Sequence, residues 1–345
     1  MIDWDLTRRL GSKLSGSPEF RGPDPDALAG LCEEALSAVV AYSGLEPAGP
    51  VPRAEAVTRP EWIAANTASL EPLIEPALAG VGERAGPAGH GLQLAAAVTL
   101  TVEAGAVLGL LSRKVLGQYD LSLVRRPDSP PPRLLFVAPN VGEAMANLGR
   151  DGADFLRWIA LHELTHAVQF GSVPWLRDHL GGVATELIGS LDSSDEGARR
   201  SAFDRVGKVA GRAARTVRGR DPLHLLMDER ERALVDQMQS AMALIEGHAE
   251  HVMDKADPES IPSLGRLRPT MEAKRNSPGP LWRVLGKLLG LELKMRQYET
   301  GRRFCDGVVD IAGVESLNLA WASPEAIPEP AELEQPRLWL DRVTG

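Results

Sequence analysis

The chain has 345 residues, of which 43% are hydrophobic and 25% charged, a composition that is typical of folded proteins and excludes wholesale disorder. A formal net charge of −9 and an aromatic content of only 5% argue against nucleic acid or an anionic membrane as a partner. The two cysteines lie far apart and match no metal or redox spacing, which argues against a disulfide framework and favours a reducing compartment. The charged N-terminus differs from a secretory signal, so we expect a cytoplasmic protein.

Three helices are predicted in the first third of the chain, at about 25–43, 59–80 and 92–111. The first two are separated by the Gly- and Pro-rich stretch 44–53. The third is almost wholly apolar, but Glu103 and several Gly and Thr residues interrupt it. This interruption favours a buried core helix over a membrane span.

Two strands are predicted on either side of the Pro-rich stretch 125–133, at 119–124 and 133–138. Each is a short run of β-compatible apolar residues that ends in turn-forming residues. A two-stranded hairpin is therefore expected in this part of the chain.

A long helix is predicted next, from about Asp154 to Phe170, with Asp151 or Asp154 as its cap and Gly171 and Pro174 at its end. It carries the motif that contributes most to the functional hypothesis, as described below.

The rest of the chain is mostly predicted as helix, at 181–255 and again at 281–304. Between them, the polar stretch 257–280 is predicted to be a mobile loop. Basic residues at 205–215 share one helix face, which is better explained as a solvated surface than as a docking surface for an acidic partner.

The sequence His-Glu-Leu-Thr-His occupies positions 162–166 of the predicted long helix. Residues four apart lie on the same helix face, so His162 and His166 can reach one metal ion. Glu163 is rotated by roughly a quarter turn from His162 and can approach a metal-bound water without binding the metal. Zinc peptidases use this arrangement, in which the metal lowers the pKa of the water and the glutamate takes its proton. The alternative is a pair of ordinary core histidines.

A catalytic zinc ion needs a third protein ligand. Gln169 and Ser172 stand where the metzincin extension has Gly and His, so that ligand set is excluded. Glu246 interrupts an apolar helix stripe, and a metal ion would offset the cost of burying its carboxylate. Glu250, one turn later, could accept the free ring N–H of a ligand histidine. The alternatives are His248 as the ligand, or Glu246 in an ion pair inside a helix bundle.

A hydrolytic zinc site also needs a group that stabilises the oxyanion. Tyr298 is the predicted catalytic candidate, with Arg296 and His224 as further candidates.

The HELTH motif, together with Glu-Gly-x-Ala at 246–249, resembles the gluzincin pattern, in which the Glu of Glu-Gly is the third ligand. The segments WIALHELTHAVQFGSVPWLRDHL, LIEGHAEHVMD and KMRQYETGRRF resemble, more narrowly, a bacterial family of zincin-like hydrolases found in actinobacteria and chloroflexi. Some members of that family are linked by genome context to the biosynthesis of a deazaflavin coenzyme. The resemblance spans about 116–309, and it departs from better-known gluzincins in the 80 residues between His166 and Glu246.

The resemblance implies an α+β, predominantly helical, zincin-like fold with a small sheet beside the active-site helix. In zincins the edge strand of this sheet can hold an extended peptide, and RLLFVAPN at 133–140 is the predicted edge. We expect an N-terminal helical region at 1–115, a zincin-like catalytic region at 116–322 and a Pro- and Glu-rich tail at 323–345.

The sequence thus predicts a zinc-dependent hydrolase, with Zn²⁺ as cofactor and Glu163 as general base, that acts on a peptide or small amide substrate. Two alternatives remain open. One is a metal-stabilised helical protein that binds a partner through the 205–215 face and the 257–280 loop and cleaves nothing. The other is an amidase or esterase that acts on a small metabolite.

Overall fold

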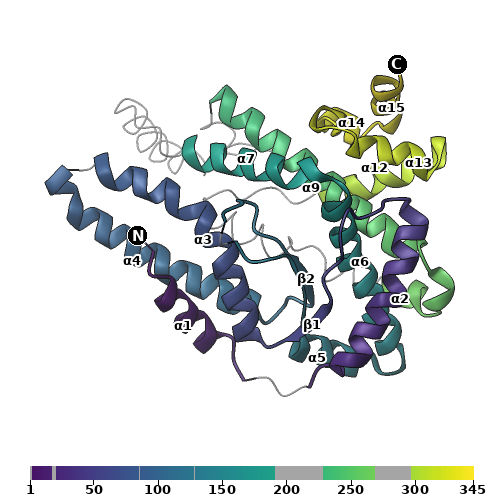
Figure 1. Ribbon diagram of the computed structural model, residues 1–345, viewed down its shortest axis with the longest axis horizontal. Coiled ribbons are helices and arrows are strands. Elements are labelled where there is room, and N and C mark those ends of the chain that lie inside the picture. Colours follow the sequence, from purple (N-terminus) through teal and green to yellow (C-terminus); the bar gives the residue numbers. More distant parts are fainter. Residues whose placement is uncertain (1, 18–20, 85, 128, 191–227, 269–296) are drawn as a thin grey trace, which may run out of the picture.

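The structure is a computed structural model that describes residues 2–17, 21–84, 86–127, 129–190, 228–268 and 297–345 (Figure 1). Within the helices, only the backbone is described at 77–84, 86–96, 190 and 297–299. The protein is predominantly helical with one small sheet, as predicted.

The sheet has three strands in the order β1-β3-β2. Strand β3 (Arg133–Val137) is antiparallel to β2 (Gly117–Asp120), which confirms the predicted hairpin, although β2 begins and ends earlier than expected. Strand β1 (Ala54–Val57) is parallel to β3 and was not predicted, because its four residues directly follow the Gly- and Pro-rich stretch. The prediction that 133–140 forms the sheet edge is wrong. Strand β3 is central and its apolar residues are buried, so the edge next to the functional helix is β2.

The helices predicted in the N-terminal third are present as α2, α3 and α4. The principal helices are α1 (Trp4–Leu14), α2 (Pro25–Ser43), α3 (Arg59–Arg84), α4 (Gly86–Leu111), α5 (Ala138–Leu148), α6 (Gly152–Ser172), α7 (Pro174–Ser190), α9 (Glu229–Lys255) and α12 (Gln297–Ala312). The C-terminal segment adds the short helices α13 (Val314–Leu317), α14 (Pro330–Leu333) and α15 (Pro336–Thr344). Helix α2 shows why the sequence signals were informative. Asp24 accepts the N–H groups of Asp26 and Ala27 at its start, and Gly44 adopts a positive φ of 67° at its end.

The sheet lies between α3 on one side and α6 on the other, and α2 packs on the outer side of α6 (Figure 1). Helix α9 packs against α6, and α12 packs against α9. The first strand and α3 belong to the predicted N-terminal region, yet β1 pairs with β3 of the predicted catalytic region. The proposed division at residue 115 therefore runs through a shared sheet.

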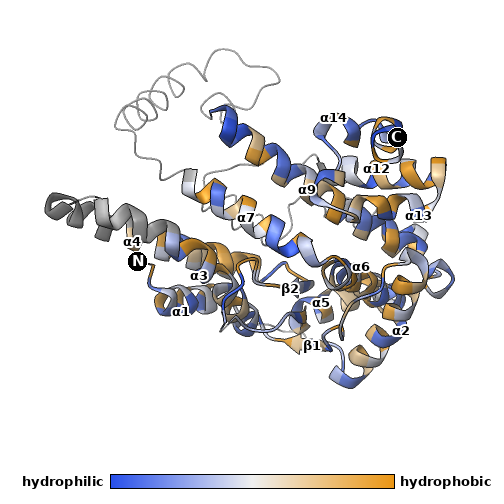
Figure 2. Cartoon of the chain, turned by 45° about the horizontal axis from the view of Figure 1, so that its top comes forward, coloured by the Kyte–Doolittle hydropathy of each residue, from blue (hydrophilic) through white to orange (hydrophobic). Residues whose placement is uncertain are grey.

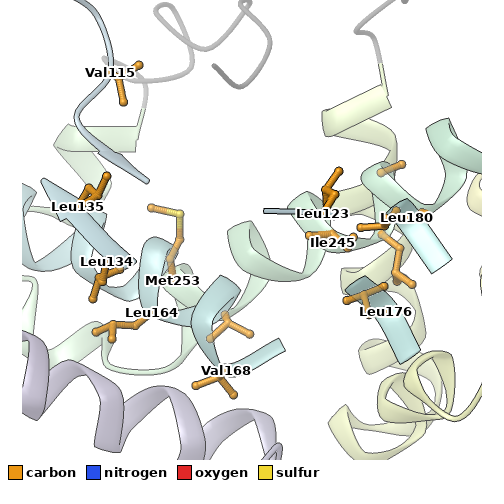
Figure 3. Packing of buried hydrophobic residues seen from close by; sticks show 14 of the residues in the cluster. Val115, Leu123, Leu134, Leu135, Leu164, Val168, Leu176, Leu180, Ile245 and Met253 are labelled. Atoms are coloured by element: carbon orange, nitrogen blue, oxygen red, sulfur yellow. The ribbon is translucent and has the colours of Figure 1, made fainter. Parts of the chain in front are cut away.

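A continuous core of buried side chains surrounds the sheet and α6. Figure 3 shows Leu134 and Leu135 of β3 near Leu164 of α6, and a second group near the start of α7 that includes Leu180 and Ile245. The start of α9 is hydrophilic in Figure 2, while its later residues, which pack on α6, are largely apolar. The second half of α9 is thus held inside the protein.

The beginning of α6 differs from the prediction. Asp151 precedes the helix but makes no capping hydrogen bond, and its carboxylate pairs with Arg266 at 2.8 Å. Asp154 accepts hydrogen bonds from the backbone N–H and the hydroxyl of Ser263, at 2.9 and 2.6 Å. Ser263 and Arg266 of the predicted mobile loop therefore bond to the start of α6, while 269–280 lie outside the described residues.

Helix α4 is a partial exception to the predicted buried helix. It packs against α1 through Gly105 and Gly109, but its Val98, Val102 and Leu110 side chains are exposed. No described helix combines the length and apolar character that crossing a membrane requires. Both cysteines, Cys32 and Cys305, are buried as free thiols.

Candidate metal centre

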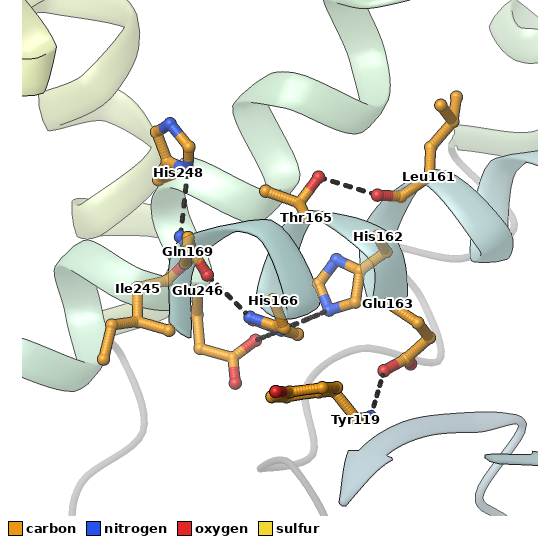
Figure 4. A network of polar contacts seen from close by, with 10 residues as sticks. All are labelled: Tyr119, Leu161, His162, Glu163, Thr165, His166, Gln169, Ile245, Glu246 and His248. Atoms are coloured by element: carbon orange, nitrogen blue, oxygen red, sulfur yellow. Dashed lines mark hydrogen bonds and ion pairs between the residues drawn. The ribbon is translucent and has the colours of Figure 1, made fainter. Parts of the chain in front are cut away.

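Helix α6 places two imidazoles against each other. His162 and His166 are one turn apart, and their Nε2 atoms approach to 3.2 Å (Figure 4). The rings meet edge to face, with centroids 4.7 Å apart and planes at 87°. The preceding turns of α6 bury Phe155, Trp158 and Ile159, which fixes the face of the helix that points inward. Two ring nitrogens are thereby directed at one point.

Glu246 on α9 completes a triangle with the two histidines. Its Oε2 atom lies 3.6 Å from Nε2 of His162 and 3.7 Å from Nε2 of His166. The fold therefore brings Glu246 next to a histidine pair that ends 80 positions earlier in the sequence. Among the described residues, this is the one group of three or more His, Cys, Asp or Glu side chains that could hold a metal ion.

The dimensions of this triangle fit a zinc ion. Ligand atoms bound tetrahedrally at about 2.0–2.1 Å lie about 3.3–3.4 Å from each other. The observed separations of 3.2, 3.6 and 3.7 Å are close to that value before any adjustment of the side chains. Two imidazoles and one carboxylate also form a donor set that zinc favours.

The electrostatics of the triangle reflect its burial and its opposite charges. Burial alone would raise the pKa of Glu246, but the neighbouring His166 and His162 outweigh it and lower that pKa. Burial would likewise lower the pKa of His166, but Glu246 and Glu163 raise it to about 9. Glu246 is therefore ionised at neutral pH, as a metal ligand must be.

Gln169 orients the ring of His166. Its Oε1 lies 2.9 Å from Nδ1 of His166, while its Nε2 donates to the backbone carbonyl of Ile245 and approaches Nδ1 of His248, both at 2.9 Å. Because the amide nitrogen faces those two acceptors, the amide oxygen must face His166. When a metal ion is bound, His166 would keep its proton on Nδ1, facing Gln169, and would direct the lone pair of Nε2 at the ion.

His248 lies apart from the triangle. Its Nδ1 meets Gln169, and its ring edge packs against Trp321, with centroids 5.3 Å apart. Burial, with smaller effects from His251 and His166, lowers the pKa of His248 to about 3, so the ring is neutral. The alternative in which His248 replaces Glu246 as a ligand does not match this geometry.

The prediction that Glu250 orients a ligand histidine is wrong. The Nδ1 atom of His166 is bonded to Gln169, and the Nδ1 atom of His162 is buried without a hydrogen-bond partner among the described residues. Sequence reasoning considered Gln169 only as a position that excludes a ligand. Its position three residues after His166, on nearly the same helix face, was the signal that could have identified it.

Glu163 lies between α6 and the edge strand. Its Oε2 accepts the backbone N–H of Tyr119 at 3.1 Å, and its side chain is only 8% exposed (Figure 4). A Cβ atom at Gly117 would lie 2.6 Å from Cγ of Glu163, so only glycine leaves room for this carboxylate. Burial is the largest influence on the pKa of Glu163 and raises it, despite the opposing effects of both histidines.

Tyr119 is a site residue that the sequence analysis missed. Its ring stacks on Phe170, with centroids 5.9 Å apart. Because Phe170 follows His166 by four residues, the tyrosine ring lies over the same face of α6 as the two imidazoles, beside Glu246 (Figure 4). Burial raises the pKa of Tyr119 to about 12, and its hydroxyl forms no hydrogen bond with a described residue.

The triangle opens onto a cavity of about 170 Å³ between the edge of β2, α3, α6, α7 and α9. Glu163 and Tyr119 line the same cavity. Its walls are largely apolar, and the residues that form them include Leu70, Leu73, Leu123, Phe170, Leu180, Met242 and Ile245.

Several predicted residues cannot be placed. Tyr298 is near the start of α12, but its side chain lies outside the described residues. Arg296, His224 and the basic face at 205–215 lie outside them entirely. Their predicted roles stay predictions.

Comparison with known proteins agrees with this geometry. A family model described as zincin-like metallopeptidase matches residues 2–340. The chain belongs to this family. A crystal structure from Chloroflexus aurantiacus, described as a "putative hydrolase with a novel fold", is 27% identical, with a TM-score of 0.75 over 99% of this chain and 98% of that one. The comparison with curated proteins found no match. Membership of the zincin-like metallopeptidases implies a metal ion, typically zinc, and the His162, His166 and Glu246 triangle is a possible site for it.

Proposed function

We propose that this zincin-like metallopeptidase is a zinc-dependent hydrolase that cleaves peptide bonds, with zinc held by His162, His166 and Glu246. The observation that carries the proposal is the triangle of three ligand atoms opening onto a cavity. A structural zinc site is normally closed by four protein groups, whereas a catalytic site keeps one position free for water or substrate. The cavity beside the triangle therefore favours an enzyme over a metal-stabilised binding protein.

When bound, zinc would make a water molecule more acidic and polarise the scissile carbonyl. Glu163 would accept the proton of that water on Oε1, because Oε2 is occupied by the Tyr119 N–H. The same carboxylate would then deliver the proton to the leaving amine. Gly117 leaves room for this carboxylate against the edge strand.

The edge of β2 supports a peptide as the substrate. The N–H of Tyr119 points away from β3 and toward Glu163, so this side of β2 has no strand beside it among the described residues. An extended peptide can pair with such an edge through backbone hydrogen bonds. A small metabolite would make no use of this feature, which is why we favour peptide cleavage over the amidase and esterase alternative.

Tyr119 is our preferred oxyanion stabiliser, alongside the earlier candidate Tyr298. The hydroxyl of Tyr119 has no hydrogen-bond partner among the described residues, and Tyr119 lines the cavity beside Glu246. The raised pKa keeps this hydroxyl protonated and able to donate. A donor aimed at the developing negative charge contributes about 10²–10³-fold to the rate in comparable sites.

Replacing Glu163 tests the proposed function. With a digest of unmodified peptides as substrate and mass spectrometry as the readout, Glu163→Gln should bind one zinc ion per chain but lose at least about 10²-fold in turnover. His162→Ala should lose both zinc and turnover. The matched control is Glu186→Gln on α7, where Glu186 forms an exposed ion pair with Arg230 of α9. This variant should behave like the parent. Equal turnover in Glu163→Gln and the parent, or a zinc-loaded parent that cleaves no peptide, would contradict the proposal.

The three tyrosines of the chain allow the oxyanion stabiliser to be identified. Tyr119→Phe keeps the ring on Phe170 and the backbone bond to Glu163, so kcat should fall by about 10²-fold with zinc content unchanged. Tyr298→Phe tests the candidate from sequence in the same assay. Tyr42→Phe removes a 2.7 Å contact with His251, outside the cavity, and should lower stability without changing kcat. A kcat unchanged in Tyr119→Phe and reduced in Tyr298→Phe would assign the role to Tyr298.

A further inference from the structure

The edge strand β2 presents different side chains to the two sides of the sheet. Gly117 and Tyr119 face α6 and the metal triangle, as their contacts with Glu163 and Phe170 show. Gln118 and Asp120 face α3 on the other side, and both also line the cavity. The cavity thus has a second polar group of residues besides the metal triangle.

Asp120 is the charged residue of this second group. It is only 6% exposed, and its Oδ1 accepts from the hydroxyl of Ser69 at 3.0 Å and from Nε2 of Gln118 at 3.2 Å. It has no ion pair within 4.0 Å with any residue that the structure describes. Arg133, opposite Asp120 in the sheet, directs its guanidinium at Glu55, with bonds of 3.0 and 2.6 Å. A buried carboxylate without a bonded cation is costly, and burial raises the pKa of Asp120 accordingly.

The neutral neighbours hold Asp120 in a fixed arrangement. Trp62 can only donate, and its Nε1 donates to Oε1 of Gln118 at 2.7 Å. The amide nitrogen of Gln118 must then face Oδ1 of Asn66 and Oδ1 of Asp120, both at 3.2 Å. These bonds involve Oδ1 of Asp120, and Oδ2 has no hydrogen bond within the described part of the chain. The arrangement keeps one carboxylate oxygen available to a ligand.

The surroundings of Asp120 define the shape of that ligand. Leu70 and Leu73 of α3 line the cavity near Ser69, and Leu123 and Leu180 line it as well. The volume of about 170 Å³ is similar to that of an engineered cavity of about 150 Å³ that accepts benzene, so one medium-sized side chain fits. A group that suits both features has an aliphatic stem and a cationic tip.

We propose that the cavity selects substrates that carry an ammonium or guanidinium group on an aliphatic stem, and that Asp120 pairs with this cation. The inference rests on the proposed function, because it assigns the substrate class of the same site. Lysine and arginine side chains have this chemistry, and a free peptide N-terminus has the same charge on a shorter stem. A peptide paired with β2 would direct alternate side chains toward α3 and toward the metal triangle, so one substrate residue can reach Asp120 while its neighbour lies at the zinc site.

Cleavage of matched peptides tests the proposal. The peptides are N-acetylated and identical except for one position beside the scissile bond, which holds lysine, arginine or norleucine. We expect the zinc-loaded parent to cleave the lysine or arginine peptide at least 10-fold faster than the norleucine peptide. The second arm uses norleucine peptides without the acetyl group. If only these peptides are cleaved faster than the acetylated norleucine peptide, the cation recognised by Asp120 is the peptide N-terminus. Equal rates for every peptide in the parent would overturn the proposal.

The variant Asp120→Asn keeps the shape of the side chain and the acceptor for Ser69 but removes the charge. It should reduce the ratio of the lysine or arginine rate to the norleucine rate from at least 10-fold to less than 2-fold. Asp178→Asn, at an exposed position on α7, makes the same charge change outside the cavity and should retain the preference. An unchanged preference in Asp120→Asn would also overturn the proposal.

A binding measurement separates this inference from the proposed function. We would titrate n-butylguanidinium and n-butylurea, which have similar shapes but differ in charge, into the zinc-loaded parent and follow binding by calorimetry. The parent should bind the guanidinium at least 5-fold more tightly, and Asp120→Asn should bind the two alike. If the parent shows this preference but cleaves no peptide, the proposed function fails and the recognition of a cation stands. Equal affinities in the parent would refute the recognition whether or not the variant folds.

Discussion

Helices α6 and α9 contribute to the same metal triangle in different ways. Helix α6 supplies two of its members and the proposed general base within five consecutive residues, and their arrangement follows from helical periodicity alone. Helix α9 supplies only Glu246, whose position depends on how α9 packs against α6 and α12. The comparison shows that the positions of the two histidines and Glu163 depend on local helix geometry, whereas the position of Glu246 depends on tertiary contacts.

Two contacts fix α9 on either side of Glu246. Gly247, next to Glu246, faces Gly301 of α12 so closely that a Cβ atom at Gly247 would lie 2.2 Å from the carbonyl carbon of Gly301. On the opposite side, Gln169 of α6 donates to the carbonyl of Ile245. The residues on both sides of Glu246 are thus fixed, one by close helix packing and one by a hydrogen bond.

The largest effect is expected for Gly247→Ala. The added methyl group would force α9 and α12 apart, so the free energy of unfolding should fall by about 3 kcal/mol. Because Glu246 is itself a proposed ligand and would move with the helix, the affinity for zinc should fall by more than about 100-fold. Chemical denaturation and competition with a chelator measure the two effects.

Gly182→Ala on α7 is the control for this prediction. No atom lies within 4 Å of a Cβ at Gly182, so this change should be neutral or should stabilise the helix by up to about 1 kcal/mol. If Gly247→Ala were as stable as the parent, the close packing of α9 on α12 would not be what positions Glu246.

A smaller effect is expected for Gln169→Leu, which removes one of the hydrogen bonds between α6 and α9. His166 would lose the partner of its Nδ1 atom, and zinc affinity should fall by about 10–100-fold. Gln237→Leu, at an exposed position on α9, is the matched control. The measurement is zinc affinity at a temperature at which both variants are folded, and only Gln169→Leu should bind zinc more weakly than the parent. If Gln169→Leu bound zinc as tightly as the parent, Gln169 would not orient His166.

The smallest effect on the site is expected far from it, at Glu332 of α14. Its carboxylate pairs with Arg342 at 2.6 and 2.8 Å. Burial would raise the pKa of Glu332, but Arg342 outweighs it and lowers that pKa below the ordinary value of 4.5. Glu332→Gln should therefore lower the free energy of unfolding by about 1–3 kcal/mol at pH 7 and leave zinc affinity unchanged.

The pH dependence of this difference follows from the direction of the shift. A lowered pKa means that the ionised Glu332 stabilises the folded state above pH 4.5, and that this stabilisation is lost as the pH falls further. The gap between the parent and Glu332→Gln should thus close on acidification. If the difference in free energy of unfolding stayed constant down to the lowest pH at which both proteins fold, the ion pair would not be its source.

The sequence predicted best what depends on neighbouring residues. The bounds of α2 follow from Asp24 and Gly44, and the HELTH spacing identified three residues of the site because a helix fixes their directions. Glu246 was found because a carboxylate stood out on an apolar stripe. These signals require only the period of a helix and the cost of burying charge.

What the sequence did not predict depends on distant contacts. Strand β1 has only four residues, and its pairing with β3 spans some 80 positions, so β3 was mistaken for the sheet edge. Tyr119 became a site residue only because its ring stacks on Phe170 of another element. Gln169 and Asp120 are identified by their partners, His166 and the residues of α3, rather than by any motif.

The separation of the two histidines from Glu246 has a consequence during synthesis on the ribosome. The 80 residues between positions 166 and 246 take about 4–16 s to translate at about 5–20 residues per second. Throughout that interval the nascent chain already carries the imidazole pair but has no carboxylate to complete it. The three candidate ligands are therefore complete only after α9 has emerged, so a metal ion held by all three cannot guide the assembly of the earlier helices.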